Sequence, residues 1–193
     1  MRVTRHPYEV EGWGVGELWV GDGRVVVAHD PPMPGVSLVG AAEIGPKTHP
    51  KTHPRGTPGV PTETLTTESR QETNAFVTDL LQRLHRYFGG ERIQLADVPL
   101  DGDWGTPFQD ALARALRAVP WGEVVTYGEL SALAGRRRAA RAAGTFCAEN
   151  RFSLFVPCHR VVSANGIGGY GSLGVDYKRR LLQLEGAPVD GAL

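Results

Sequence analysis

Cys158 and His159 stand side by side, directly after Pro157 and inside an apolar run. Cysteine is an intrinsically strong nucleophile once ionised, so a thiol held in one place could accept a group from a substrate. Pro157 fixes its own φ angle and lacks an N–H, which stiffens the chain that enters Cys158. The apolar neighbours predict an extended, at least half-buried segment at a sheet edge or bend. These features favour a nucleophile, but a cysteine in an apolar run is as often a small core residue.

His159 is expected to act on Cys158 indirectly. Successive side chains of an extended segment point to opposite faces, so a direct Cys–His pair would be awkward, and a bridging water or a local twist is needed. Glu185 is a candidate relay acid. It stands at the end of the last predicted helix, before Gly186, where the helix dipole disfavours a carboxylate. A plain salt bridge is the alternative role for Glu185.

Composition fits a globular chain with one large or two small domains. The 193 residues are 41% hydrophobic and 22% charged. The two cysteines lack metal-like spacing, which argues against a disulfide framework and favours a reducing cytosol. No secretion-like leader and no bilayer-length apolar run are present, so we expect a cytoplasmic protein that does not contact membranes. Residues 105–193 carry eleven Lys/Arg against seven Asp/Glu, which suggests an anionic partner.

The first half predicts a small sheet and a loop. A hairpin is expected over Trp13–Asp30, with its turn at Gly21–Gly23, and residues 35–40 could add a short strand. Residues from about 41 to 67 are polar and rich in proline, and include the tandem Lys-Thr-His-Pro repeat at 47–54. The two repeat histidines could suggest a metal site. The prolines forbid a helix there, however, so a solvated loop is favoured and no metal site is predicted.

Helix signals are clear in the rest of the chain. Ser69 and Glu72 form a capping box, and Gly89–Gly90 ends that helix. Thr106 caps a second helix with proline at its first position, and Thr126 with Glu129 caps a third. Further helices are expected at about 137–148 and 176–184. The Thr126 helix and the one after it form a helix-turn-helix pattern, with Gly135 at the turn.

The helix at 137–148 has a face that suits close contact with DNA. Residues 139–144 carry small side chains except for Arg141. Three arginines, Arg136, Arg137 and Arg138, are expected in its first turn, where the helix dipole opposes positive charge. DNA phosphates would neutralise them, although a solvated basic turn is the alternative. The glycine-rich loop at 166–174 lacks the spacing of a nucleotide-binding fingerprint, and we expect its backbone to close over a small ligand.

Together these motifs resemble the O6-alkylguanine-DNA alkyltransferase family, also called methylated-DNA–protein-cysteine methyltransferases. The resemblance runs in order and spacing from about residue 70 to 187. The residues that carry it are Pro157-Cys158-His159-Arg160-Val161, Gly122-Glu123-Val124-Val125-Thr126-Tyr127, Ala139-Ala140-Arg141-Ala142-Ala143-Gly144, Asn150, and Leu181-Leu182 before Glu185-Gly186.

The resemblance implies an α+β fold with two domains. Residues 1–95 would form a ribonuclease-H-like domain with a small antiparallel sheet and a helix. Residues 96–193 would form a mainly helical, winged-helix-like domain that binds DNA and accepts the alkyl group. The implied function is DNA repair by direct, stoichiometric transfer of the alkyl group from O6-alkylguanine to the protein's own cysteine, with O4-alkylthymine as a second candidate lesion. The implied partner is double-stranded DNA, bound by a monomer in the minor groove with the damaged base flipped out. No cofactor is implied.

Residue roles follow from the resemblance, position by position. Cys158 becomes the alkyl acceptor, with His159 and Glu185 linked to it through water, and Asn150 positions the cysteine segment. Tyr127 helps rotate the nucleotide and polarises the base, and Arg141 fills the gap left in the duplex. The implied DNA-contacting residues are Tyr127, Gly128, Arg136, Arg137 and Arg141. The implied base pocket consists of Tyr127, Val161, Tyr170, Gly171 and Ser172.

Three departures from the family pattern stand out. Arg136 replaces a capping asparagine that many relatives have, and Arg151 replaces a proline that often follows Asn150. The N-terminal part has no cysteine, so the structural zinc of some relatives is not expected.

Two other function classes remain open. A damage-binding protein of the same architecture would bind the flipped base without chemistry, but members of that branch have tryptophan in place of Cys158. A thiol hydrolase would need a histidine in direct reach of Cys158, which the adjacent spacing makes awkward.

Overall fold

The computed structural model describes residues 1–35 and 67–188, with side chains from residue 75 onward in the second range. The candidate strand at 35–40, the loop at 41–67 with its repeat, and the side chains of the Ser69–Glu72 capping box therefore lie outside the described residues. The chain forms two compact units. One contains Met1–Ile93 with Val98–Asp101, and the other contains Gln94–Asp97 with Gly102–Leu193.

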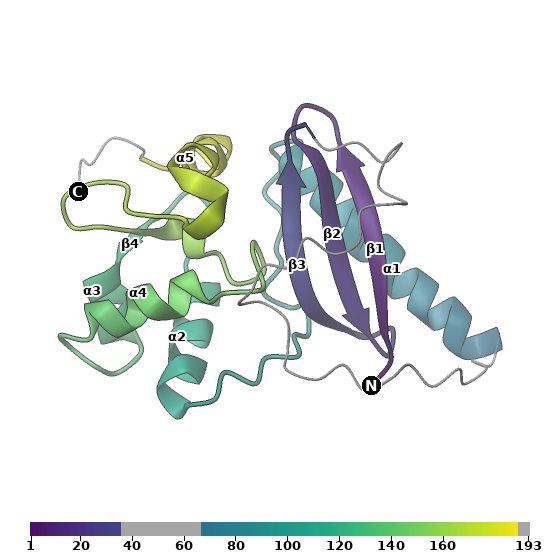
Figure 1. The fold of residues 1–193 in the computed structure, drawn as a ribbon, viewed down its shortest axis with the longest axis horizontal. Helices are drawn as coiled ribbons and strands as arrows, with labels where there is room; N and C mark the ends of the chain where they lie inside the picture. Colours follow the sequence, from purple (N-terminus) through teal and green to yellow (C-terminus); the bar gives the residue numbers. More distant parts are fainter. Residues whose placement is uncertain (36–66, 189–193) are drawn as a thin grey trace. The chain divides into compact units, whose positions relative to one another are not determined.

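The first unit contains a three-stranded antiparallel sheet in the order β1-β2-β3 (Figure 1). Its strands are β1 (Val3–Val10), β2 (Gly14–Gly21) and β3 (Val25–Met33). The predicted hairpin between β2 and β3 is present. Asp22 and Gly23 have φ angles of 45° and 70°, and positive φ at two turn residues matches the right-handed twist of the paired strands.

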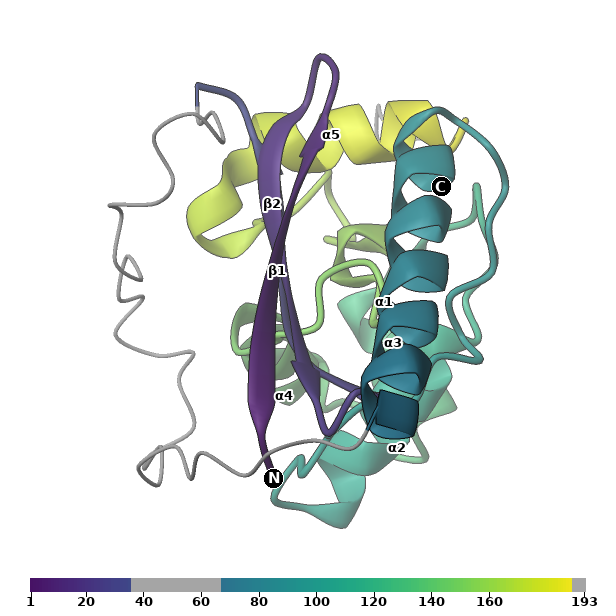
Figure 2. The same cartoon turned by 90° about the vertical axis from the view of Figure 1, so that its right-hand side faces the viewer.

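Helix α1 (Thr67–Phe88) packs against one face of this sheet (Figure 2). Apolar side chains from both sides of this contact are buried, which forms the core of the unit. The helix ends as predicted in its glycine pair, because Gly90 takes a φ of 87° and the N–H of Glu91 bonds to the carbonyl of Arg86. Among the buried residues are Tyr8, Leu18, Val20, Leu80, Leu84 and Tyr87.

Two strand predictions were incomplete. Strand β1 was missed altogether, although it pairs with β2 along its full length. Its Pro7 argues against a central strand, and β1 is in fact an edge strand, where a missing N–H is tolerated. Strand β3 also runs further than expected and includes Pro31 and Pro32 at the other side of the sheet.

The second unit is mainly helical. It contains α2 (Pro107–Arg117), α3 (Tyr127–Leu133), α4 (Ala140–Ala148) and α5 (Gly174–Leu184), with the short 3-10 helices η2 (Cys158–Arg160) and η3 (Gly171–Leu173). An α+β fold with a small antiparallel sheet is thus confirmed at this level.

A short parallel pairing positions the residues of interest. Strand β4 (Val125–Thr126) pairs with β5 (Val161–Val162), so that Val125 lies opposite Val161. Strand β4 leads directly into Tyr127, and β5 follows directly from η2. The pairing therefore brings Tyr127 and Cys158, which are far apart in sequence, into one region.

Local capping signals specified the helix starts correctly. The Thr106 hydroxyl accepts a hydrogen bond from the Gln109 N–H, and the capping box between Thr126 and Glu129 is complete. Helix α3 also ends as expected, with Gly135 at a φ of 85°.

The predicted start of the following helix was wrong. Helix α4 begins at Ala140 and not at about 137, and Arg138 has a φ angle of 65°, which a helix cannot include. The three arginines therefore lie before the helix, and the dipole of α4 is not a reason for them to seek phosphates.

Among the helices in the described part of the chain, none is long and apolar enough to cross a membrane.

The cap at Thr126 sets where α3 begins, and it gives a stability prediction. We expect Thr126→Ala to lower the free energy of unfolding by about 1 kcal/mol, because the N–H of Glu129 loses its acceptor. Thr126→Ser keeps the hydroxyl and should lose much less. Urea unfolding followed by circular dichroism measures both variants. Equal losses would show that the threonine methyl group, and not the cap, carries the effect.

Candidate active site

Cys158 begins a buried turn. The carbonyl of Pro157 accepts a hydrogen bond from the Arg160 N–H at 2.9 Å, which closes the 3-10 helix η2, and only 7% of Cys158 is exposed. The prediction of an extended segment was wrong here. Every residue from 152 to 162 is buried, so the run has no polar face, and a short apolar run of this kind does not distinguish a strand from a turn.

Asn150 fastens this turn to the end of α4. Its side-chain amide donates to the carbonyl of Val156 at 2.8 Å and to the Cys158 Sγ at 3.1 Å. Its carbonyl oxygen accepts from the N–H of Phe152 at 3.0 Å. One side chain thus holds both ends of the segment that leads to the thiol. Because the residues on both sides are fixed, the sulfur has little freedom to move.

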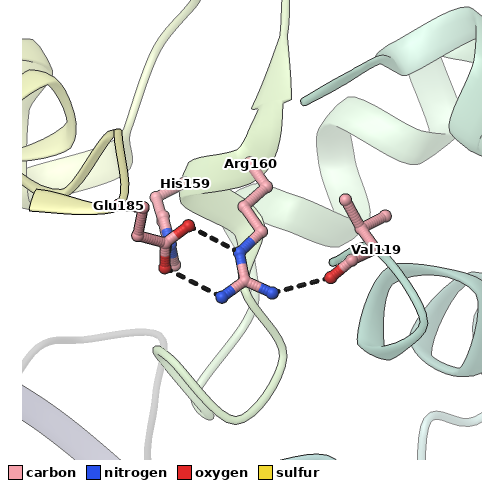
Figure 3. A network of polar contacts seen from close by, with 4 residues as sticks. All are labelled: Val119, His159, Arg160 and Glu185. Carbon is pink, nitrogen blue, oxygen red and sulfur yellow. Dashed lines mark hydrogen bonds and ion pairs between the residues drawn. The ribbon is translucent and has the colours of Figure 1, made fainter. Parts of the chain in front are cut away.

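A buried carboxylate holds the other side of the turn. Glu185 accepts hydrogen bonds from His159 Nε2 at 2.9 Å and from Arg160 Nε and Nη2, both at 2.8 Å (Figure 3). Arg160 Nη1 donates to the carbonyl of Val119 at 2.7 Å, beyond the end of α2. The carboxylate, 4% exposed as a residue, is satisfied by two partners that directly follow Cys158.

The charges in this network can be assigned. Burial by itself would raise the pKa of Glu185, but the hydrogen bonds from His159 and Arg160 outweigh it and hold that pKa far below its usual range. Burial lowers the pKa of His159, against the attraction of Glu185. Glu185 is therefore ionised and His159 neutral. Because the carboxylate accepts from Nε2, this nitrogen carries the hydrogen, and Nδ1 is the ring nitrogen able to take up a proton.

The thiol itself is protonated in the resting site. Burial raises the pKa of Cys158, while the Asn150 amide, the Lys178 ammonium and the Tyr170 hydroxyl oppose this rise. Burial likewise raises the pKa of Cys147, the other free cysteine, to a value that keeps it a thiol. Cys158 thus needs to lose its proton before it can act as a nucleophile.

Tyr127 lies in the same region as the two cysteines. Burial raises its pKa, and so would negative charge on Cys147 or Cys158, so its hydroxyl stays protonated and can donate a hydrogen bond. Two glycines lie beside its ring. A Cβ on Gly168 would come within 3.4 Å of the Tyr127 hydroxyl, and one on Gly144 of α4 within 3.9 Å of the ring.

The predicted pocket residues are only partly gathered. Val161 and Tyr170 are buried, and the ring of Tyr170 stacks on Tyr177 and meets His159 edge-on. Gly171 and Ser172 are exposed in η3.

The basic residues near α4 differ from one another. Arg136, Arg137, Arg138 and Arg141 are all exposed, as is Gly128 of α3. The guanidinium of Arg136 lies over the ring of Phe108 in α2, 4.7 Å from its centre. Arg136 thus has a packing contact within the protein, which the sequence did not indicate.

Comparison with known proteins agrees with this geometry. The family model described as 6-O-methylguanine DNA methyltransferase, DNA binding domain, matches residues 107–187. A Metallosphaera sedula protein named methylated-DNA–protein-cysteine methyltransferase is 42% identical over 120 residues, or 62% of this chain and 74% of the relative. A Methanosarcina acetivorans protein of the same name is 41% identical over 121 residues, or 62% of this chain and 76% of the relative.

The chain belongs to the methylated-DNA–protein-cysteine methyltransferase family. A solved structure of Mycobacterium tuberculosis OGT in complex with DNA is 32% identical, with a TM-score of 0.64 over 95% of this chain and 94% of that one. The methyltransferase from Pyrococcus kodakaraensis, at 23% identity and a TM-score of 0.58, shows the shared fold. The resemblance inferred from the sequence motifs is confirmed.

Sequence reasoning missed two cations of this methyltransferase site. Arg160 was treated only as part of a motif, yet it makes more hydrogen bonds to Glu185 than His159 does. Lys178 was not considered at all. A signal existed, because Lys178 lies three and four residues before Leu181 and Leu182, on the buried face of α5. A lysine on an apolar face is unusual unless it has a buried partner.

Among the described residues, no group of three or more His, Cys, Asp or Glu side chains could hold a metal ion. The histidines of the repeat at 47–54 lie outside that range.

The Glu185 network predicts a dependence of stability on pH. The pKa of Glu185 is lower in the folded protein than its usual value of about 4.3, so its contribution is present above that pH and is lost as the pH falls. We expect the free energy of unfolding to decline from about pH 5 downward. Glu185→Gln should cost about 3–5 kcal/mol at neutral pH, because Arg160 stays buried without its partner charge, and should flatten the acid decline.

Urea unfolding at several pH values measures this, with Glu149→Gln, at an exposed helix end, as the matched control. An acid decline that is as steep in Glu185→Gln as in the unchanged protein would contradict the assigned charges.

Proposed function

We propose that this protein repairs DNA by direct reversal, transferring the alkyl group of O6-alkylguanine to Cys158 in a single turnover. The observation that carries the proposal is that the Cys158 thiol is fixed in position by hydrogen bonds. Asn150 donates to the sulfur, and the Glu185 network fixes the residues that follow it. This arrangement lies in the part of the chain that matches the family's DNA-binding domain. The relatives' name, methylated-DNA–protein-cysteine methyltransferase, states the same donor and acceptor.

The chemistry follows from the charges of the site. The Cys158 proton passes to the unprotonated Nδ1 of His159, through a bridging water, and the thiolate attacks the alkyl carbon. A carbon–sulfur bond forms while the carbon–oxygen bond breaks, and its electron pair stays on the guanine. The guanine takes up one proton, for which the Tyr127 hydroxyl is the positioned donor. Tyr127 then recovers a proton from the protonated His159 through solvent, so the proton lost by the thiol is the one that the guanine gains overall. The product is a thioether, which water does not cleave, and each molecule reacts once.

DNA would meet the protein at α3 and α4. A lesion inside the base stack cannot be reached, so the nucleotide is flipped out at a cost of roughly a few kcal/mol. The small side chains of α4 permit close approach to the minor groove, with Arg141 filling the gap and Tyr127 and Gly128 beside the flipped nucleotide. Arg137 and Arg136 are both exposed and could contact phosphate, with the Arg136 guanidinium lying over Phe108. The base pocket would include Val161, Tyr170, Gly171 and Ser172.

The finer architecture is part of the proposal. We expect a ribonuclease-H-like domain at 1–95 and a winged-helix-like domain at 96–193. The second of these contains every residue proposed for the reaction, which is consistent with a monomer. The acceptor thiol has to remain reduced, which favours the cytoplasm. No cofactor is needed, because the thiol, the base and the proton donor are all side chains of this chain.

The acceptor can be tested by peptide mapping. After reaction with duplex DNA containing O6-methylguanine, we expect the methyl group on Cys158 and none on Cys147, whose resting thiol lacks the Asn150 hydrogen bond. Cys158→Ser should abolish transfer, because a hydroxyl is a far weaker nucleophile, yet should still bind the methylated duplex. A methyl group on Cys147, or loss of DNA binding by a folded Cys158→Ser protein, would overturn the assignment.

Arg141 and Arg137 should contribute in different ways. Arg137→Ala removes a phosphate contact, so we expect weaker binding to any DNA and a log–log salt dependence shallower by about one unit. Arg141→Ala should slow repair in duplex DNA more than it weakens binding, because the vacated stack is no longer filled.

The defect of Arg141→Ala should shrink on free O6-benzylguanine, where no stack has to be filled. Equal losses on the duplex and on the free base would mean that Arg141 acts on chemistry or folding and not on the gap.

A further inference from the structure

Lys178 is unlike the other basic residues of the chain. The sequence contains eighteen arginines but only three lysines, and the other two are Lys47 and Lys51 of the repeat. Lys178 is fully buried, on the face of α5 that also carries Leu181 and Leu182. Burial of an ammonium group is costly unless its charge is compensated. Lys178 therefore needs a physical explanation.

The ammonium of Lys178 joins three elements of the site. Nζ donates to the carbonyl of Val161 at 2.5 Å and to the carbonyl of Gly169 at 3.3 Å. Val161 begins β5 directly after the turn that contains Cys158. Gly169 follows Gly168, where an added Cβ would meet the ring and hydroxyl of Tyr127. Through this one side chain, helix α5 holds both the turn that contains Cys158 and the glycine-rich loop at 166–174, here called the pocket loop.

The charge of Lys178 has no carboxylate partner among the described residues in contact with it. Both of its hydrogen-bond acceptors are neutral carbonyls. The groups near it that can become negative are the thiols of Cys158 and Cys147. Burial lowers the pKa of Lys178 to about 8, so the group still carries its charge at neutral pH. A positive charge is thus already present where a thiolate would form.

We propose that Lys178 is a positioning residue that serves as the counter-cation of the Cys158 thiolate while fastening the pocket loop to β5. The inference rests on the proposed function only in taking Cys158 as the acceptor. Ionisation of Cys158 turns a buried, uncompensated cation into a buried ion pair, so each group stabilises the charge of the other. His159 then serves to remove the proton, and Lys178 to hold the charge that remains.

The other groups around Lys178 do not replace it in this role. His159 is neutral, and the charges of Arg160 and Lys178 lower its pKa further. Cys147, on α4, experiences the same attraction to Lys178. Cys158 differs from Cys147 because the Asn150 amide also donates to its sulfur, at 3.1 Å. The cation favours both thiolates, and the hydrogen bond from Asn150 selects Cys158.

Reactivity toward iodoacetamide tests the proposal without DNA. This small reagent alkylates the thiolate, so its rate measures the ionised fraction of a cysteine. Mapping of the labelled peptide shows that the reacting cysteine is Cys158. Removing a neighbouring opposite charge should raise the thiol pKa by about 1–3 units. We therefore expect Lys178→Met to shift the midpoint of the pH–rate profile upward by at least about one unit, which is about tenfold in rate at pH 7. Lys178→Arg keeps the charge and should restore much of the midpoint.

Arg179→Gln is the matched control, because it removes a neighbouring cation of the same helix that pairs with exposed Asp176. Its midpoint should stay where it is in the unchanged protein. An unshifted midpoint in folded Lys178→Met, or the same shift in Arg179→Gln, would overturn the proposal.

A second measurement leaves Lys178 in place and covers the case in which its variants do not fold. Isotope-labelled lysine gives only three side-chain signals in this chain, so Lys178 is readily assigned once Lys47 and Lys51 are replaced by arginine. Its titration midpoint should lie near pH 8 and should fall in Cys158→Ser, since the coupling is reciprocal. The same midpoint in both proteins would contradict the proposal.

Neither measurement uses DNA or alkyl transfer. A protein that shows the coupling but does not repair DNA would overturn the proposed function and leave the role of Lys178 standing. A protein that repairs DNA without the coupling would do the reverse.

Discussion

The acceptor site depends on one buried carboxylate. Glu185 stands at the end of α5, where Gly186 adopts a φ of 68° and ends the helix. Desolvating a carboxylate is expensive, and the cost is offset because its two oxygens accept three hydrogen bonds from His159 and Arg160. These partners directly follow Cys158 in η2. The carboxylate therefore joins the last helix to the nucleophile's turn, and Arg160 extends this connection to Val119.

Burial of Cys158 holds its thiol in position but makes the thiol harder to ionise. A thiol that is 7% exposed is held firmly by its neighbours, but the same surroundings disfavour its thiolate. The site offsets this with donors and charge placed before the reaction begins, namely the amide of Asn150 and the cation of Lys178. Preorganised groups of this kind stabilise charge as it develops without having to move. Reactivity then depends on removing one proton, for which the unprotonated Nδ1 of His159 is the acceptor.

Features with local causes could be predicted from the sequence. The caps at Thr106 and Thr126 and the terminal glycines of α1 and α3 depend on residues a few positions apart, and the structure has them as expected. The motif around Cys158 also identified the family. Features with distant causes were missed or wrong. The pairing of β4 with β5 depends on residues 36 positions apart, such as Val125 and Val161, and no local pattern marks it.

The errors have similar physical origins. The turn at Cys158 was taken for an extended segment because it is buried on every side, so its apolar residues show no period. The predicted start of α4 was too early because Arg138 has a left-handed backbone. Nothing in the sequence indicates this, since arginine rarely adopts a positive φ angle. Lys178 was passed over because a lysine in an amphipathic helix is usually on the solvent side. Its spacing from Leu181 and Leu182 indicates the buried face of α5, and its tertiary contacts show which elements it joins.

The proposed reaction inactivates the protein after one alkyl transfer per molecule, and a stoichiometric titration tests this most directly. A fixed amount of protein is incubated to completion with increasing amounts of duplex DNA carrying a radiolabelled O6-methylguanine, and the label bound to protein and the guanine restored in DNA are both counted. The account predicts that both quantities stop together at one per protein molecule, however much DNA is present. Restored guanine that continues to rise beyond the amount of protein would contradict it, as would repair without label on the protein.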